Sequence, residues 1–68
     1  MNYSFIELEV VLGGGTTKKE AFNVAHIVNF ESGPYGAIIH LSTKESYAVK
    51  QTYDEVVKIF NKISEYIG

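Results

Sequence analysis

The feature that most constrains the fold is a single change of hydrophobic period near Thr52. Before it, Ile6, Leu8 and Val10 alternate with other residues, which is the period-2 pattern of a strand with one buried face. After it, apolar residues recur at spacings of three and four, which is the pattern of an amphipathic helix. These positions are Val56, Ile59, Phe60, Ile63 and Ile67. The chain therefore predicts an α+β fold with its strands first and one α-helix at the C-terminal end.

The strand-forming part is predicted to contain strands at about residues 3–12, 21–31, 37–42 and 47–50. These segments are rich in β-branched and aromatic residues, and short polar or glycine-containing turns separate them. Asn23 is expected to interrupt the second segment, because asparagine favours turns over strand pairing. The close spacing predicts a small antiparallel sheet, a meander of four to five strands, in a single domain of residues 1–68.

The helix is predicted over residues 53–67, packed on one face of this sheet. Thr52 and Glu55 fit a capping box, in which each side chain accepts a hydrogen bond from the other residue's backbone N–H. Asp54 and Glu55 also suit the positive end of the helix dipole. The helix should therefore begin at Tyr53.

Apolar residues on both sides of the strands constrain the assembly. A chain of 68 residues without cysteine buries only about 60% of its unfolded surface, so oligomerisation would help to stabilise it. Ile38 and Ile39 point to opposite faces of the third strand, and Val28 and Phe30 lie opposite Ile27 in the second. Because one helix covers one face, a second copy is predicted to cover the other, at an oligomer face of Val28, Phe30 and Ile38. The alternative is a sheet that curls over its own second face, as in a small barrel.

Composition limits the classes of partner. The net charge is −2 and all six basic residues are lysines, which argues against a dedicated nucleic-acid reader. No apolar run reaches about 18 residues, and the N-terminal segment has no secretion signal, so we expect no membrane insertion and a cytoplasmic location. Short chains without arginine are also common among phage products, so the bacterial cell is the expected setting, with or without a phage origin. No cofactor and no metal site are expected, since cysteine is absent and His26 and His40 lie 14 residues apart.

The segment "LGGGTTKKE", residues 12–20, resembles a phosphate-binding loop only in composition. Its glycines are consecutive, and the next predicted element is a strand, whereas a Walker loop has a defined glycine–lysine spacing and opens a helix. We interpret the segment as a hairpin tip that its lysines keep soluble. The alternative is a mobile lid whose Lys18 and Lys19 contact an anionic ligand.

The turn "SGPYG", residues 32–36, carries Tyr35 between proline and glycine. A rigid exposed tyrosine on a turn is typical of binding surfaces, and the alternative is a ring that folds back on its own sheet. Tyr35, Gly36 and His40 are therefore candidate residues for ligand or partner binding. His26 and His40 would need a nucleophile or an orienting carboxylate for catalysis. The sequence places neither reliably, so we expect interface or rim histidines and no enzyme.

From Phe22 onward, the spacing resembles the FlbD family of small flagellar and swarming-motility proteins. "NVAHIVNFE" and "AIIHLSTKESYAVKQTYDEVVKI" carry the residues that match. These are Asn23, Ile27, Glu31, Ile39, Leu41, Tyr47, Val49, Thr52, Glu55 and Val56. Three features depart from the family pattern: a longer glycine loop, Lys44 in place of a glycine, and Gln51 in place of a glutamate. The resemblance implies the strand-then-helix fold and a non-catalytic role.

Two functions follow as hypotheses. The first is an FlbD-like, non-catalytic binding module that acts as a homo-oligomer and contacts another protein through its turns and second sheet face. The second is a phage-encoded, anti-defence type protein whose oligomer sequesters a small anionic, nucleotide-like ligand through Lys18, Lys19 and Tyr35.

Overall fold

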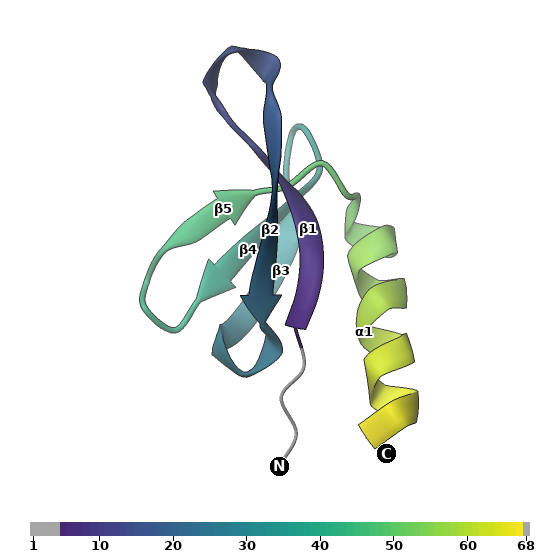
Figure 1. The fold of residues 1–68 in the computed structure, drawn as a ribbon. Helices are drawn as coiled ribbons and strands as arrows, with labels where there is room; N and C mark the ends of the chain where they lie inside the picture. Colours follow the sequence, from purple (N-terminus) through teal and green to yellow (C-terminus); the bar gives the residue numbers. More distant parts are fainter. Residues whose placement is uncertain (1–4, 68) are drawn as a thin grey trace.

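The computed structural model describes the backbone of residues 5–67 and the side chains of residues 5–63. It contains five strands followed by one α-helix, so the predicted α+β class is confirmed (Figure 1). The elements are β1 (Phe5–Val11), β2 (Thr17–Asn23), β3 (Ile27–Ser32), β4 (Ala37–Leu41), β5 (Ser46–Ala48) and α1 (Tyr53–Ile67). None of the described residues forms a helix with the length and hydrophobicity of a membrane span.

The strands form two antiparallel sheets, a β1–β2 hairpin and a β3–β4–β5 meander. The predicted strand over residues 21–31 is in fact two strands, because the chain turns at Asn23 as expected. The Asn23 side chain accepts a hydrogen bond from the N–H of Ala25 at 3.0 Å, at the start of the 3₁₀ turn Val24–His26. The residues before this turn pair with β1, and those after it pair with β4. β2 also begins earlier than expected, at Thr17.

The hairpin and α1 cover the same face of the β3–β4–β5 sheet. Phe30, Ile39 and Tyr47 stand opposite one another across the three strands, so their side chains share this face. Phe22 of the hairpin meets the Tyr47 ring edge-on at a centroid distance of 5.5 Å. Phe60 of α1 stacks on Phe30 at 5.3 Å. The core thus lies between the meander on one side and the hairpin and helix on the other.

Eight apolar side chains of the described residues are fully buried in this core. They are Ile6, Leu8, Val10, Phe22, Ala37, Ile39, Val49 and Val56. The hairpin forms a second layer over the meander, on the same face as α1. Within the described residues the second face is therefore not buried by the sheet itself, contrary to what the curled-sheet alternative supposed.

The opposite face of the meander, which we call the open face, carries Glu31, Ile38, His40, Ser46 and Ala48. Ile38 is half-buried there, as expected for a residue of the second face. Phe30 was expected on the same face, but it packs against α1 within its own chain. Val28 lies at an irregularity of the β3–β4 register and is 67% exposed.

The start of α1 has the predicted capping box. The Thr52 N–H donates to Glu55 Oε1 at 2.8 Å, and the Glu55 N–H donates to Thr52 Oγ1 at 3.2 Å. The two hydrogen bonds occupy two N–H groups that the helix itself leaves without partners. They fix the point at which the chain leaves the sheet and enters the helix.

Candidate binding site

Three segments that are distant in sequence meet at one end of the molecule, which we call the hairpin end (Figure 1). They are the tip of the β1–β2 hairpin, the turn of residues 33–36 and the linker between β5 and α1. The linker ties them together, since the Lys50 N–H donates to the Glu9 carbonyl at 2.8 Å and the Ala37 N–H donates to the Gln51 carbonyl at 2.8 Å. The Gln51 side chain also accepts a hydrogen bond from the Glu9 N–H, at 3.1 Å.

The turn of residues 33–36 is fixed at both ends. The Gly33 N–H donates to the Gly36 carbonyl at 2.6 Å. A Cβ atom at Gly36 would clash with the Val49 carbonyl oxygen and stand 2.8 Å from that of Gln51, so only glycine fits there. Tyr35 sits on this turn and is 78% exposed. The ring is therefore presented to solvent and does not fold back on the sheet.

The glycine run forms the tip of the hairpin, as expected. Gly14 and Gly15 have φ values of 79° and 83°, and the Leu12 N–H closes the turn by donating to the Thr16 carbonyl at 2.7 Å. A Cβ atom at any of the three glycines would have no neighbour within 4 Å. Gly14 and Gly15 therefore provide the positive φ values that this turn requires, and the three glycines leave open space around the backbone.

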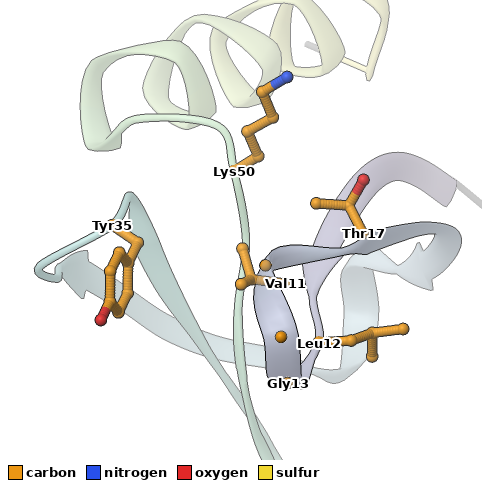
Figure 2. Close-up of a pocket in the computed structure, with 8 residues that line it drawn as sticks. Val11, Leu12, Gly13, Thr17, Tyr35 and Lys50 are labelled. Carbon is orange, nitrogen blue, oxygen red and sulfur yellow. The ribbon is translucent and has the colours of Figure 1, made fainter.

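A hollow of about 640 Å³ lies between these segments (Figure 2). Figure 2 shows Tyr35 and Thr17 on opposite sides of Val11, with Lys50 extending from the linker. The eight lining residues are Val11, Leu12, Gly13, Gly14, Gly15, Thr17, Tyr35 and Lys50. The wall is mainly apolar, one lining residue is basic and none is acidic. An apolar cavity with a few convergent polar groups is the usual form of a small-molecule site.

The structure brings only one of the five predicted binding residues into this hollow, namely Tyr35. Lys18 belongs to β2 and pairs with Glu20 at 3.2 Å, and Lys19 stands opposite Glu9 in β1. Neither lysine lines the hollow. Gly36 is not among the lining residues and serves the packing of its turn. The basic residue of the hollow is Lys50, which sequence reasoning missed.

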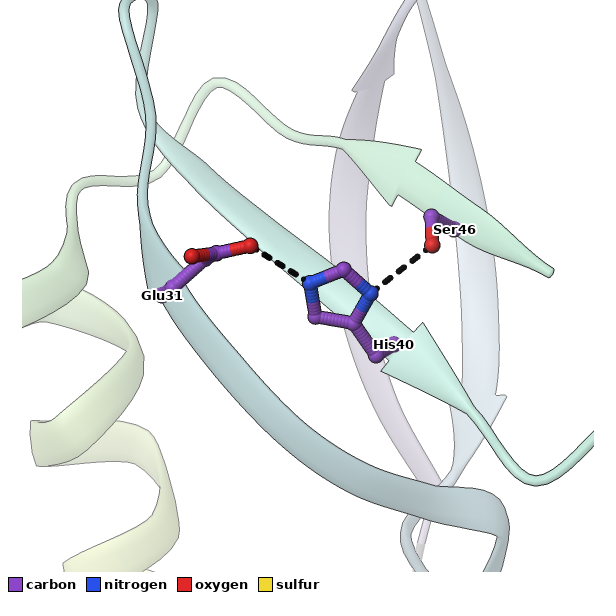
Figure 3. Close-up of polar contacts among 3 residues, drawn as sticks. All are labelled: Glu31, His40 and Ser46. Atoms are coloured by element: carbon purple, nitrogen blue, oxygen red, sulfur yellow. Dashed lines mark hydrogen bonds and ion pairs between the residues drawn. The ribbon is translucent and has the colours of Figure 1, made fainter. Parts of the chain in front are cut away.

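His40 takes part in a polar cluster on the open face, separate from the hollow (Figure 3). Its Nε2 lies 2.7 Å from Glu31 Oε2 and its Nδ1 lies 2.8 Å from Ser46 Oγ. The cluster crosses all three strands of the meander. The signal for this cluster is the strand register. In the β4–β5 pair Ser46 stands opposite His40, and in the β3–β4 pair Glu31 is the diagonal neighbour of His40.

Carboxylate, imidazole and hydroxyl stand here in the order of a serine–histidine–acid triad. Acyl transfer also needs oxyanion donors and a water-excluding site around the nucleophile. Glu31 and Ser46 are both exposed on the sheet surface, so we interpret the cluster as a polar connection between strands. His26 is not part of it, since its Nδ1 lies 3.4 Å from Ser42 Oγ.

The chain was compared with protein-family models, with curated proteins and with solved structures, and none of them matches it.

Proposed function

We propose that the chain is a non-catalytic binding module of the bacterial cytoplasm that acts as a homo-oligomer, in a role like that of the FlbD family. The observation that carries this proposal is the presentation of Tyr35. Its ring is 78% exposed, although the turn beneath it is fixed by the hydrogen bond between Gly33 and Gly36 and by the close packing of Gly36. A contact made from an already ordered turn costs less conformational entropy on binding than one made from a flexible loop.

Self-association is proposed through the open face. The hairpin and α1 both lie on the opposite face of the meander, which leaves Ile38 half-buried on the open face. Val28, at the register irregularity of β3, is 67% exposed. A two-fold pairing of such faces would bury the same patch on both copies and add apolar burial to a domain whose own core is small.

The residues that carry the resemblance to the FlbD family have structural tasks in this fold. Asn23 ends one strand, Ile39 and Val49 are buried in the core, and Thr52 and Glu55 cap the helix. These tasks agree with a strand-then-helix pattern like that of the FlbD family. The flagellar setting is part of the proposal.

The assembly is tested by sedimentation at micromolar concentration. We expect a species heavier than the 7.6 kDa monomer for the wild-type chain and dissociation for Val28→Lys. Asn61→Lys, on the exposed surface of α1, is the matched control because it adds the same charge away from the open face. A folded wild-type chain that sediments only as a monomer would overturn the homo-oligomer.

The binding role is tested by Tyr35→Ala, with Tyr35→Phe as the control that keeps the ring. We expect a protein partner cross-linked to the wild-type chain in cells to be lost with Tyr35→Ala and kept with Tyr35→Phe. Equal cross-linking by both variants would contradict a role for this turn.

The absence of catalysis is tested separately. A fluorophosphonate probe, which labels nucleophilic serines, should leave Ser46 unlabelled.

A second candidate function, favoured by the hollow at the hairpin end, is sequestration of a small anionic ligand. This is the role that the sequence suggested for a phage-encoded protein, now with Lys50 in place of Lys18 and Lys19.

A further inference from the structure

We propose that the hollow at the hairpin end is a binding site for a planar ring that bears a single anionic group, such as a nucleoside monophosphate, with Tyr35 against the ring and Lys50 against the anion. The inference uses the proposed binding role of Tyr35 and does not depend on self-assembly.

The size and wall of the hollow suit such a ring. Its volume of about 640 Å³ falls within the usual range for small-molecule sites, about 300–1,000 Å³. Val11, Leu12 and Tyr35 supply apolar and aromatic surface from three separate positions. The three glycines of the hairpin tip add backbone without side chains, so a flat molecule has room to approach.

Lys50 supplies the positive charge. Its backbone is held by the hydrogen bond to Glu9. Its exposed side chain lines the hollow, and its ammonium end points away from Val11, toward the rim (Figure 2). Within the described side chains, the ion pairs are those of Lys18 with Glu20 and of His40 with Glu31, so the Lys50 ammonium group has no carboxylate within 4 Å. A ligand anion would therefore meet an ammonium group that no described carboxylate already pairs.

The surroundings of Lys50 limit the charge of the ligand. Lys50 also lines a smaller hollow, together with Glu9, Gln51 and Glu55. A second or third negative group on the ligand would approach the carboxylates of Glu9 and Glu55. Like charges at short range repel. We therefore infer that the site takes one anionic group and gains nothing from a polyphosphate.

The experiment is an amide chemical-shift titration of the full chain with AMP, adenosine, ATP and inorganic phosphate. We expect saturable shifts at residues 11–17, 35 and 50, and about fivefold tighter binding of AMP than of adenosine, as for an exposed ion pair. ATP should bind no tighter than AMP, and phosphate alone should bind more weakly than either nucleotide.

Two variants assign the roles of the side chains. Lys50→Gln should remove the preference for AMP over adenosine, whereas Lys62→Gln, which removes the same charge from the exposed surface of α1, should keep it. Tyr35→Ala should weaken AMP and adenosine alike, by about 10-fold or more, because base stacking on an aromatic ring is lost.

The proposal is overturned if AMP produces no saturable shifts, if the shifts fall on Lys18 and Lys19 and not on Lys50, or if Lys50→Gln keeps the preference for AMP. An assembled chain that ignores AMP would refute this site and leave the proposed oligomer standing. A monomer that binds AMP would support this site and refute the proposed oligomer.

Discussion

The two glycine-containing turns at the hairpin end look alike in sequence and differ in what they require. At the hairpin tip, Gly14 and Gly15 adopt positive φ values, and side chains there would point into open space. In the turn of residues 33–36, no glycine has a positive φ, but Gly33 and Gly36 lie against neighbouring atoms. The first turn needs glycine for its backbone conformation, and the second needs it for space.

The difference explains how the two turns serve one site. The packed turn is held against the linker of residues 49–51, so Tyr35 keeps its place at the edge of the hollow. The hairpin tip contributes an uncrowded backbone to the opposite edge. The comparison can be tested one glycine at a time.

The largest effect is expected for Gly36→Ala. The added methyl group would press on the carbonyl oxygens of Val49 and Gln51, which are backbone atoms and cannot rotate away. We expect the free energy of unfolding, measured by urea denaturation, to fall by about 3 kcal/mol. Gly13→Ala, with open space and no positive φ, is the control and should change it little. Equal losses for the two variants would contradict a specific lack of space at Gly36.

An intermediate effect is expected for Gly14→Ala and Gly15→Ala. Each forces a Cβ atom into the left-handed region, so each should lower the free energy of unfolding by about 1 kcal/mol. Asparagine tolerates this region better than alanine, so Gly14→Asn should cost less than Gly14→Ala. Urea denaturation of the three variants would show whether conformation, and not space, is the demand at this turn.

A smaller effect, of opposite sign, is expected at the turn between β4 and β5. Lys44 has a φ of 73°, which is the left-handed region, although it is not a glycine. Lys44→Gly should relieve about 1 kcal/mol of strain and lose part of that gain to the greater freedom of the unfolded chain. We expect a net stabilisation of about 0.5 kcal/mol by urea denaturation, and a loss of stability would contradict a backbone demand here.

The smallest effect on stability is expected for Tyr35→Ala. Because most of the ring is exposed, its removal should change the free energy of unfolding by less than about 0.5 kcal/mol, even though binding is lost. A large loss of stability, in the same urea measurement, would mean that the ring serves the fold and not a partner.

Local signals made the helix and its cap predictable from sequence. Thr52 and Glu55 act within one turn, and the apolar stripe of α1 needs no knowledge of the rest of the chain. The interruption at Asn23 was predictable for the same reason. The start of β2 was not, because Thr17, Lys18 and Lys19 are exposed residues of an edge strand and show no hydrophobic period.

The face occupied by Phe30 could not be obtained by counting residues. Strict alternation places Phe30 with Val28 and opposite Ile27. The register irregularity between Ile27 and Asn29 shifts the parity, so Ile27 and Phe30 both face the core, opposite Leu41 and Ile39. A bulge leaves little trace in a single sequence.

The binding site was predictable only in part. Tyr35 follows from turn chemistry alone, since the signal lies within the five-residue segment 32–36. Lys50 enters the site only because the linker bonds to Glu9 and Gly36 packs against the linker backbone. Lys18 and Lys19 are close to the glycines in the sequence, but as members of β2 they lie farther along the strand than Thr17 and do not line the hollow.

The division of the core has a consequence for biosynthesis. The hairpin provides half of the eight fully buried side chains, and Val49 and Val56, near the other end of the chain, are among those that cover them. During translation, the apolar face of the hairpin therefore stays exposed until the segment through Val56 has left the ribosome. The domain should fold after synthesis of that segment in one cooperative step, and a stalled nascent chain that ends before Lys50 should be a substrate for chaperones.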